Sequence, residues 1–343
     1  MTKRVLATSL ATALLTGALT ALGLAQPALA CACGAPAPPV GTTVSVGEEQ
    51  AIVSFDGTTE RIELVLDMLA EGADTGLVVP TPAPATVSLS DASIFDALDA
   101  QTEPVVETVE DWWGAAGVGA GAGAEVLSEV DLGPISAVTL AASDAAGLQS
   151  WLDANGYGID AAVQGLFADY IARGWSFAAF KLTGQEPLDG ELDPVRLVFA
   201  ASEIVYPLLL SQAASTPQTL RLYLFGDDNM QAAFPDGTVV GDVTWAGPVT
   251  ESTLLPLGDY LTVVEASFSD PASQITGDLT ITSTGTRDDY TPTVIRTKYV
   301  QIGGIPLGVA IAGVASVFGV MVLIVIIGGI VHRRAERRRG RAW

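Results

Sequence analysis

The acidic side chains are the first candidates for chemistry in this sequence. Pairs of neighbouring carboxylates recur at Glu48-Glu49, Glu110-Asp111, Asp227-Asp228 and Asp288-Asp289. A glycosidase needs two carboxylates that flank a cleft at a defined distance. The chain has 39 acidic residues, and sequence neighbours alone do not show which of them share a cleft. We therefore assign no catalytic residue from the sequence.

Some of these acidic residues are candidate ligands for calcium, which prefers oxygen donors. Asp227, Asp228 and Asn229 with Asp236 could supply such oxygens, and Asp288-Asp289 is a second choice. Neither set matches the fixed ligand spacing of an EF-hand loop. Two interpretations stay open, a weak calcium site or ordinary solvated turns, and no other cofactor is predicted.

Histidine and cysteine offer little catalytic chemistry. The single histidine, His332, follows the apolar run near the C-terminus. The sequence before it therefore contains no His-based triad and none of the usual His-containing zinc sites. Cys31 and Cys33 are the two cysteines, and alone they cannot complete a four-ligand zinc site. They could oxidise to a disulfide outside the membrane, although a Cys-Ala-Cys ring is very tight.

Basic residues are scarce in the long central part of the chain. Residues 31–300 contain eight Lys and Arg against 38 Asp and Glu, a net charge of −30, whereas the whole chain carries −23. Such a surface repels nucleic acid and anionic headgroups, which excludes nucleic acid as a partner. Lys181 and Arg196 are two of the few cations and lie in apolar stretches. Each either pairs with a buried acid or contributes to a site for an anion or carboxylate.

An apolar run near the C-terminus organises the chain. Ile302 to Val331 contain no charge, and about 20 apolar residues suffice to cross the hydrocarbon core. Arginine-rich flanks stay on the cytoplasmic side of a membrane. The arginines after the run are Arg333, Arg334, Arg337, Arg338, Arg339 and Arg341. The sequence thus predicts a transmembrane helix over 301–331, a cytoplasmic tail over 332–343, and an extracytoplasmic position for the chain before the helix.

Residues 1–30 have the pattern of a secretory signal peptide. Lys3 and Arg4 precede an uncharged Ala/Leu-rich stretch, and Ala28-Leu29-Ala30 is a small-x-small cleavage site. We predict cleavage before Cys31. The alternative is a lipoprotein signal that leads to acylation of Cys31, although that signal wants a large aliphatic residue where Ala28 stands.

Residues 31–300 are predicted to form an α+β domain, a mixed sheet with a few helices. Alternating apolar runs around Asp56-Gly57 indicate a hairpin. Apolar stripes predict one helix after Ser143-Asp144 and another from Asp160. Further strands are predicted over Trp175–Leu182, Val195–Phe199, Thr219–Phe225 and Tyr260–Phe268. The Gly/Ala-rich run 114–124 reads as a flexible loop and as the candidate boundary within the domain.

Several short motifs between residues 31 and 225 belong together. They are Cys31-Ala32-Cys33-Gly34, Ala51–Leu66, Val78–Pro82, Trp151–Tyr157, Tyr170–Phe177, Lys181-Leu182, Pro194–Phe199 and Val205-Tyr206-Pro207. Through these motifs the sequence resembles the bacterial domain-of-unknown-function family 2330, which is common in actinobacteria. The resemblance implies a signal peptide, an exported domain and a C-terminal membrane helix. It implies no activity and transfers no catalytic residue.

Together these features predict a single-pass protein of the cell membrane with an extracytoplasmic N-terminal domain. The predicted function is a non-enzymatic binding or structural module of the cell surface, attached through its C-terminal helix and in contact with an envelope protein or glycan. The alternative is an envelope hydrolase that uses carboxylates or a bound cation. A deep pocket with convergent acids of perturbed pKa would favour the hydrolase, and a shallow apolar patch would favour binding.

Overall fold

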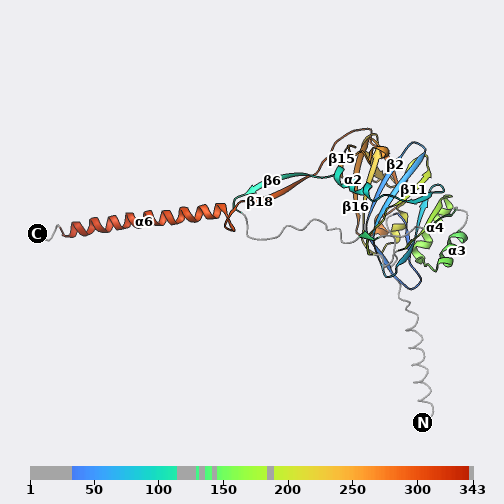
Figure 1. The fold of residues 1–343 in the computed structure, drawn as a ribbon, viewed down its shortest axis with the longest axis horizontal. Coiled ribbons are helices and arrows are strands. Elements are labelled where there is room, and N and C mark those ends of the chain that lie inside the picture. The colour runs from blue at the N-terminus through green and yellow to red at the C-terminus, as the bar shows by residue number, and fades with distance from the viewer. Residues whose placement is uncertain (1–32, 114–128, 131–135, 141–144, 184–188, 340–343) are drawn as a thin grey trace, which may run out of the picture. The chain divides into compact units, whose positions relative to one another are not determined.

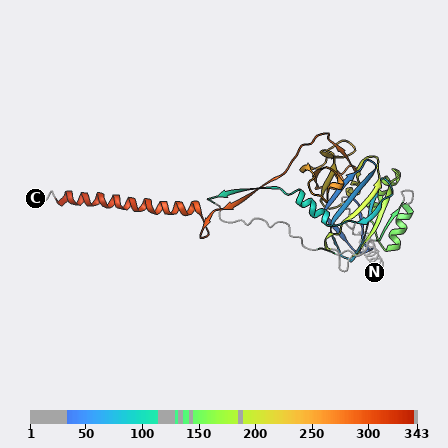
Figure 2. The same cartoon turned by 45° about the horizontal axis from the view of Figure 1, so that its top comes forward.

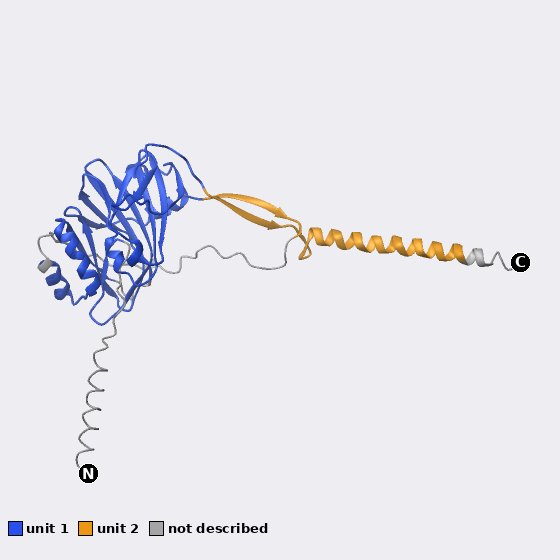
Figure 3. Cartoon of the chain, turned by 180° about the vertical axis from the view of Figure 1, so that it is seen from behind, with its two compact units in different colours: residues 1–103, 126–291 blue, residues 104–125, 292–343 orange. Residues whose placement is uncertain are grey.

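A computed structural model describes residues 33–113, 129–130, 136–140, 145–183 and 189–339 (Figure 1, and turned in Figure 2). The chain divides into two compact units (Figure 3). Unit 1 combines residues 1–103 with 126–291, and unit 2 combines residues 104–125 with 292–343. The predicted signal peptide, Cys31, the run 114–124 and Arg341 lie outside the described residues. The predicted α+β class is confirmed, because unit 1 combines strands in several sheets with helices.

The large sheet of unit 1 is built around the hairpin predicted at Asp56-Gly57. Gly57 has a φ of 95°, the left-handed region that glycine adopts without strain, and Asp56 Oδ1 accepts hydrogen bonds from the backbone N–H groups of Thr58 and Thr59. The hairpin strands are β2 (Val44–Phe55) and β3 (Thr59–Ala70). Beyond β2 lie β13 (Gln218–Gly226), parallel to it, then β16 (Tyr260–Phe268) and β15 (Asp242–Pro248). Beyond β3 lie β11 (Val195–Ala200) with β5 (Thr86–Leu89), and β10 (Asp189–Leu192) with β7 (Glu129–Val130).

A smaller sheet carries the two predicted helices of this domain. Its strand order is β1 (Ala35–Ala37), β4 (Asp74–Thr81), β9 (Ser176–Thr183) and β8 (Ser136–Leu140). The helices are α3 (Ala145–Asn155) and α4 (Ala161–Ala172). Asp160 caps α4, because its Oδ1 accepts a hydrogen bond from the Ala162 N–H at 2.7 Å. Val78 and Phe177 of the sheet pack against Leu152 and Phe167 of the helices.

Alternation along the strands explains how the layers of unit 1 are held together, since successive side chains of a strand point to opposite faces. Leu77 and Phe180, on the other face of the smaller sheet, share the main core with Val53 and Leu64 of the large sheet. The far face of the large sheet packs against α2 (Ser93–Gln101) and belongs to a separate cluster around Ile52. Unit 1 is thus layered as helices, smaller sheet, large sheet and helix, with α3 and α4 on the side away from α2 (Figures 1 and 2).

A third sheet joins the main core through its own apolar residues. Its strand order is β12 (Ile204–Tyr206), β17 (Leu279–Ser283) and β14 (Met230–Ala233). β12 ends at Tyr206 because the next residue, Pro207, has no backbone N–H to give to a ladder. The 3-10 helix η1 (Leu209–Ala213) follows directly. The other short elements are η2 (Leu255–Leu257) and α5 (Pro271–Gln274).

Unit 2 contains a two-stranded ribbon, a tight hairpin and a long helix. β6 (Val105–Asp111) and β18 (Thr293–Tyr299) pair in parallel and in register over their whole lengths. β19 (Gln301–Ile302) and β20 (Ile305–Pro306) turn across Gly303-Gly304, whose φ values are 59° and 81°. α6 (Leu307–Arg339) follows, and its residues Leu307–Arg334 are long and apolar enough to cross a membrane. The helix predicted over 301–331 therefore begins later, at Leu307, because residues 301–306 form the hairpin, and it continues past Val331 to Arg339.

Candidate functional site

Three buried carboxylates meet one short segment of unit 1. The segment is residues 204–209, which comprises β12 and the start of η1. The carboxylates belong to Glu49, Glu60 and Asp278, which are 1%, 0% and 5% exposed. Burying a charged carboxylate is costly unless it is paired, hydrogen-bonded or neutralised. The way in which each one is accommodated therefore shows what it does.

Glu49 connects the segment to the N-terminal part of the described chain. The hydroxyl of Tyr206 donates a hydrogen bond to Glu49 Oε1, and the backbone N–H of Cys33 donates to Oε2 at 3.2 Å. Glu49 lies two residues before Ala51, which points into the main core. One carboxylate thus links three parts of the chain that are far apart in sequence.

Glu60 lies on the core-facing side of β3, two residues before the core residue Ile62. Its Oε2 accepts a hydrogen bond from the Val205 N–H at 3.2 Å, while Oε1 has no hydrogen-bond partner among the described residues. Burial raises the pKa of Glu60 to about 8. The carboxyl is therefore mostly protonated at pH 7, which avoids the cost of an isolated buried charge.

Asp278 holds the end of the segment against α4. Its Oδ1 accepts hydrogen bonds from the backbone N–H groups of Leu208 at 2.9 Å and Leu209 at 3.0 Å, and from the Tyr170 hydroxyl at 2.5 Å. Its Oδ2 forms an ion pair with Arg173 Nη1 at 2.7 Å. The Arg173 guanidinium in turn lies 4.4 Å from the centre of the Tyr170 ring. Burial, followed by the negative charge of Asp278, raises the pKa of the Tyr170 hydroxyl well above its ordinary value.

All three carboxylates therefore bind groups of the protein itself, and their shared role is to fix residues 204–209. None of them lines any of the hollows described below. The geometry of these acids is that of a structural clamp rather than of a substrate site.

An open hollow on the large sheet brings together two of the scarce basic residues. Its volume is about 580 Å³, within the range of small-ligand sites. Arg61 of β3 and Arg196 of β11 line it, on strands that pair directly. The other lining residues are Ser54, Phe55, Asp56, Thr59, Val198, Asp227, Leu255, Pro256, Leu257, Gly258 and Asp259. We call this feature the arginine hollow.

A buried glutamate positions both arginines of the hollow. Glu63 is 0% exposed and forms ion pairs with Arg61 and, at 3.3 Å, with Nε of Arg196. Ser90 completes the network, because its hydroxyl donates to Glu63 and accepts from Arg196 Nη2 at 2.9 Å. The two arginine side chains remain 28% and 31% exposed. One buried negative charge thus holds two arginines whose side chains stay partly exposed, and each guanidinium has several N–H donors.

The two cations that the sequence analysis singled out have different environments. Arg196 pairs with a buried acid, Glu63, and also lines a hollow. Lys181 pairs with Asp74 at 2.6 Å, and both side chains are about one-third exposed. The hydrogen bond from Lys181 to Asp74 raises the pKa of Lys181. Lys181 thus belongs to an ion pair at the surface of the smaller sheet, and of these two cations Arg196 is the one at the candidate site.

The predicted calcium ligands are divided between two turns. The side-chain amide of Asn229 makes two hydrogen bonds with the backbone of Asp288. Its Nδ2 donates to the Asp288 carbonyl, and its Oδ1 accepts from the Asp288 N–H. Asp227 lies in the same turn, and its carbonyl accepts a hydrogen bond from Arg287. Asp228 accepts a hydrogen bond from the Ser283 hydroxyl at 2.8 Å.

Asp236 lies in a separate turn, where its Oδ1 accepts from the Thr238 N–H at 2.9 Å. That hydrogen bond holds the pKa of Asp236 below its ordinary value. Within the described ranges, no group of three or more Asp, Glu, His or Cys side chains is arranged to hold a metal. A calcium site at Asp227, Asp228, Asn229 and Asp236 stays a prediction.

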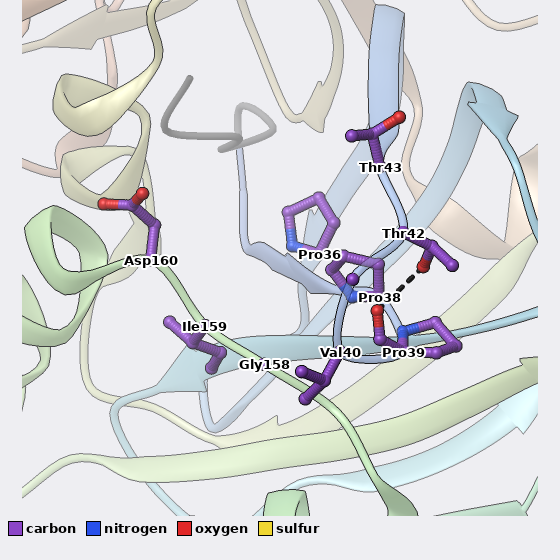
Figure 4. A pocket seen from close by; sticks show the side chains of 10 residues that line it. Pro36, Pro38, Pro39, Val40, Thr42, Thr43, Gly158, Ile159 and Asp160 are labelled. Atoms are coloured by element: carbon purple, nitrogen blue, oxygen red, sulfur yellow. Dashed lines mark hydrogen bonds between the residues drawn. The ribbon is translucent and has the colours of Figure 1, made fainter. Parts of the chain in front are cut away.

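A second, smaller pocket lies between the proline-rich segment after β1 and the start of α4. Figure 4 shows the rings of Pro36, Pro38 and Pro39 facing Ile159 and Asp160 across it. Its volume is about 150 Å³, below the roughly 300 Å³ at which small-molecule sites begin. The Asp160 carboxylate is already used to cap α4. This pocket therefore offers neither the room nor the free polar groups of a binding site.

Sequence reasoning missed the residues that matter most here, although a signal was present. Glu60 and Glu63 are acids within the apolar strand β3. Glu60 lies two residues from Ile62 and shares its face, whereas Glu63 lies two residues from Arg61 on the opposite face. An acid on the core-facing side of a strand needs a partner or a proton. The partners themselves, Val205, Ser90 and Arg196, are distant in sequence, so no local pattern identifies them.

Comparisons with known proteins support the family and leave the function open. A crystal structure of baculovirus P35 aligns with 69% of this chain and 91% of its own, at 6% identity and a TM-score of 0.33. At that similarity the likeness supports no statement about fold or function. No curated protein matches the sequence. Residues 27–282 match the profile of the family described as uncharacterized protein conserved in bacteria (DUF2330), and the chain belongs to that family.

Proposed function

We propose that this chain is a non-enzymatic binding module, held on the outer side of a membrane by α6, that recognises an acidic group of an envelope protein or glycan in the arginine hollow. The observation that carries the proposal is the pair Arg61 and Arg196, both fixed by buried Glu63 and both still partly exposed in an open hollow. Guanidinium groups fixed in this way lose little freedom when they bind a carboxylate.

The charge of the domain makes this pair distinctive. Residues 31–300 hold eight basic residues against 38 acids, and two of those eight line the same hollow. The rim contributes Asp56, Asp227 and Asp259, so the hollow is mixed in charge rather than strongly positive. Such a surface suits a ligand that combines a carboxylate with hydroxyl or amide groups, as acidic glycans and peptides do.

The attachment to a membrane rests on α6 and its flank. Leu307–Arg334 have the length and composition of a membrane span, and arginines follow them in sequence. The positive-inside rule supports a cytoplasmic position for residues 332–343 and an outer position for residues 31–300. The signal peptide predicted over residues 1–30 supports the same orientation.

The alternative is an envelope hydrolase that works with carboxylates or a cation. It would need acids that converge in an accessible pocket. Glu60, whose pKa is raised by burial, is fully buried in the main core, and Asp278 and Glu49 bind the protein's own groups. The acidic turns around Asp227 and Asp236 already use oxygen atoms in local hydrogen bonds. We therefore propose a function without catalytic residues or a resident cofactor.

Binding of matched peptides tests the proposal. The full chain in detergent micelles should bind a tetraglutamate peptide more tightly than a tetraglutamine peptide in isothermal titration. Arg196→Gln should weaken tetraglutamate binding by about tenfold or more, because a hydrogen bond to a charged group contributes about 1.5–3 kcal/mol. Glu63 keeps Arg61 and Ser90 as partners in this variant, so the fold should persist.

Arg221→Gln is the matched control. Arg221 is also a half-exposed arginine of the large sheet, and it pairs with Glu265 at 2.6 Å but does not line the hollow. The Arg221→Gln variant should bind tetraglutamate with the same affinity as the unmodified chain. Equal affinity for the two peptides, or equal losses in Arg196→Gln and Arg221→Gln, would contradict the arginine hollow as the recognition site.

A further inference from the structure

Two tryptophans from an early part of the chain pack against the start of α6. Trp112 and Trp113 follow β6 directly, whereas α6 begins at Leu307. The backbone N–H of Gly308 donates a hydrogen bond to the Trp112 carbonyl at 2.6 Å. A side chain at Gly308 would meet Trp113 ring atoms at 2.6 Å, so the indole lies directly against the glycine backbone. Within unit 2, the tryptophan pair therefore lies at the same position along the α6 axis as the first turn of that helix.

Further hydrogen bonds fix this arrangement. The Val300 N–H donates to the Asp111 carbonyl at 3.0 Å, and the Leu307 N–H donates to the Val300 carbonyl at 2.8 Å. Asp111 also accepts from the Trp113 N–H through its side chain at 2.8 Å. Both strands of the ribbon, β6 and β18, thus end where α6 begins, as the orange part of Figure 3 shows.

The side chains at this level are large, apolar and open to the surroundings. Trp112 is 45% and Trp113 66% exposed. Tyr299 at the end of β18 and Ile302 and Ile305 in the hairpin before α6 are exposed as well. We call these five residues the collar. An exposed cluster of this kind marks a contact with a partner or a membrane, and Trp and Tyr are the residues enriched where a spanning helix leaves the hydrocarbon.

We propose that Trp112 and Trp113 are interfacial anchors, inserted at the headgroup level of the same lipid bilayer that α6 spans. This inference rests on the proposed membrane attachment of α6 and adds a second point of attachment, from a part of the chain far from the C-terminus. The occupant of the collar is the lipid interface: an indole buries its apolar ring there and keeps its N–H near water. The five collar residues are uncharged, and among the described residues the one acid that the structure ties to them, Asp111, accepts the Trp113 N–H at 2.8 Å, a position compatible with the hydrated headgroup layer.

The second anchor also explains how the ribbon persists. An isolated two-stranded pair is marginal in water, and every residue of β18 and all but one of β6 are exposed. When the ends of both strands are held at the same depth in the membrane, β6 and β18 lose less conformational entropy on pairing. The tryptophans thus stabilise β6 against β18 through the bilayer, without needing further contacts along the ribbon.

Depth-dependent fluorescence quenching tests the proposal. The full chain, with Trp343→Phe to remove the C-terminal tryptophan, is placed in phosphatidylcholine vesicles that carry a nitroxide either near the headgroups or deep in the acyl chains. The headgroup nitroxide should quench part of the emission strongly and the deep nitroxide should quench it weakly. Trp112→Ala/Trp113→Ala should remove that quenched component, whereas Trp151→Phe in α3 of unit 1 should keep it.

Flotation of the same vesicles separates failure of this inference from failure of the membrane attachment. If the chain floats with the vesicles but headgroup quenching is unchanged in Trp112→Ala/Trp113→Ala, α6 is inserted and the anchor assignment is wrong. If the chain does not float, both proposals fail. A third outcome would also overturn the lipid anchor. If neither nitroxide quenches the tryptophans and their emission shifts with protein concentration, the collar contacts a second copy of the chain.

Discussion

Glu60 retains its proton at neutral pH because burial in the main core raises its pKa to about 8, whereas an unburied glutamate has an ordinary value of 4.5. Between these two pH values the folded chain binds more protons than the unfolded chain. The free energy of unfolding therefore falls as the pH rises. The contribution of Glu60 is complete below about pH 4.5 and is lost as the pH passes through about 8.

We expect Glu60→Gln to remove this pH dependence. The amide stays neutral at every pH and can still accept the hydrogen bond from the Val205 N–H. Urea unfolding of the full chain in micelles should show a loss on the order of a few kcal/mol between pH 5 and pH 9. The variant should show a much flatter curve. Other carboxyl groups titrate identically in both proteins, so a variant curve parallel to that of the unmodified chain would rule out Glu60 as the cause.

At the scale of the elements, Asp278, which directly precedes β17, connects to Arg173 at the end of α4 by an ion pair and to the start of η1 by two backbone hydrogen bonds. The pair of Asp74 and Lys181, by contrast, links two neighbouring strands at the surface. Asp278 is buried and accepts three hydrogen bonds besides its ion pair, whereas both side chains of the Asp74–Lys181 pair are about one-third exposed. A hydrogen bond to a charged group contributes about 1.5–3 kcal/mol, and an exposed ion pair contributes less than about 1 kcal/mol. The two aspartates therefore form a matched comparison.

Asp278→Asn should lower the free energy of unfolding by about 3 kcal/mol, and Asp74→Asn by less than about 1 kcal/mol. Hydrogen exchange gives a second readout, because the Leu208 and Leu209 N–H groups donate to Asp278. Their exchange should accelerate in Asp278→Asn and stay unchanged in Asp74→Asn. Similar losses of stability in the two variants would show that Asp278 is not a special constraint on residues 204–209.

The elements that local patterns specify are the ones that the sequence predicts well. The hairpin at Asp56-Gly57 needs a glycine in the left-handed region, and the helix from Asp160 needs its capping carboxylate, so both are visible over a few residues. The stretch between Arg287 and the apolar run is different. It contains β18, whose partner β6 lies far earlier in the chain. Pairing over such a distance leaves no local pattern to read.

The candidate site was only partly predictable for the same reason. Arg196 stands out in sequence because cations are scarce, but its neighbour in the hollow, Arg61, and the glutamate that positions both belong to another strand. The register of β11 against β3 brings Arg196 opposite Glu63, and a shift by one residue would point Arg196 to the other face. Register depends on the whole sheet, which is why the hollow emerged only from the fold.

At the scale of the whole molecule, charge is distributed very unevenly on the two sides of α6. Residues 31–300 carry a net charge of −30. Residues 332–343, which follow the apolar run, hold Arg333, Arg334, Arg337, Arg338, Arg339 and Arg341 against a single acid, Glu336. Arginines next to a span resist transfer across the membrane, and acids influence orientation little. The tail, rather than the acidic domain, should therefore stop the chain in its final orientation.

Replacing the six tail arginines with Gln should let part of the chains place their C-terminus on the outer side. The measurement uses an epitope tag added to the C-terminus. In the variant, protease added to intact cells should cleave part of the tag, whereas in the unmodified chain the tag stays protected. Arg296→Gln/Lys298→Gln is the control, because these two cations precede the span in β18 and their loss should leave the orientation unchanged or strengthen it. If the epitope stays fully protected without the six arginines, another feature of the chain fixes its direction through the membrane, and the tail has no such role.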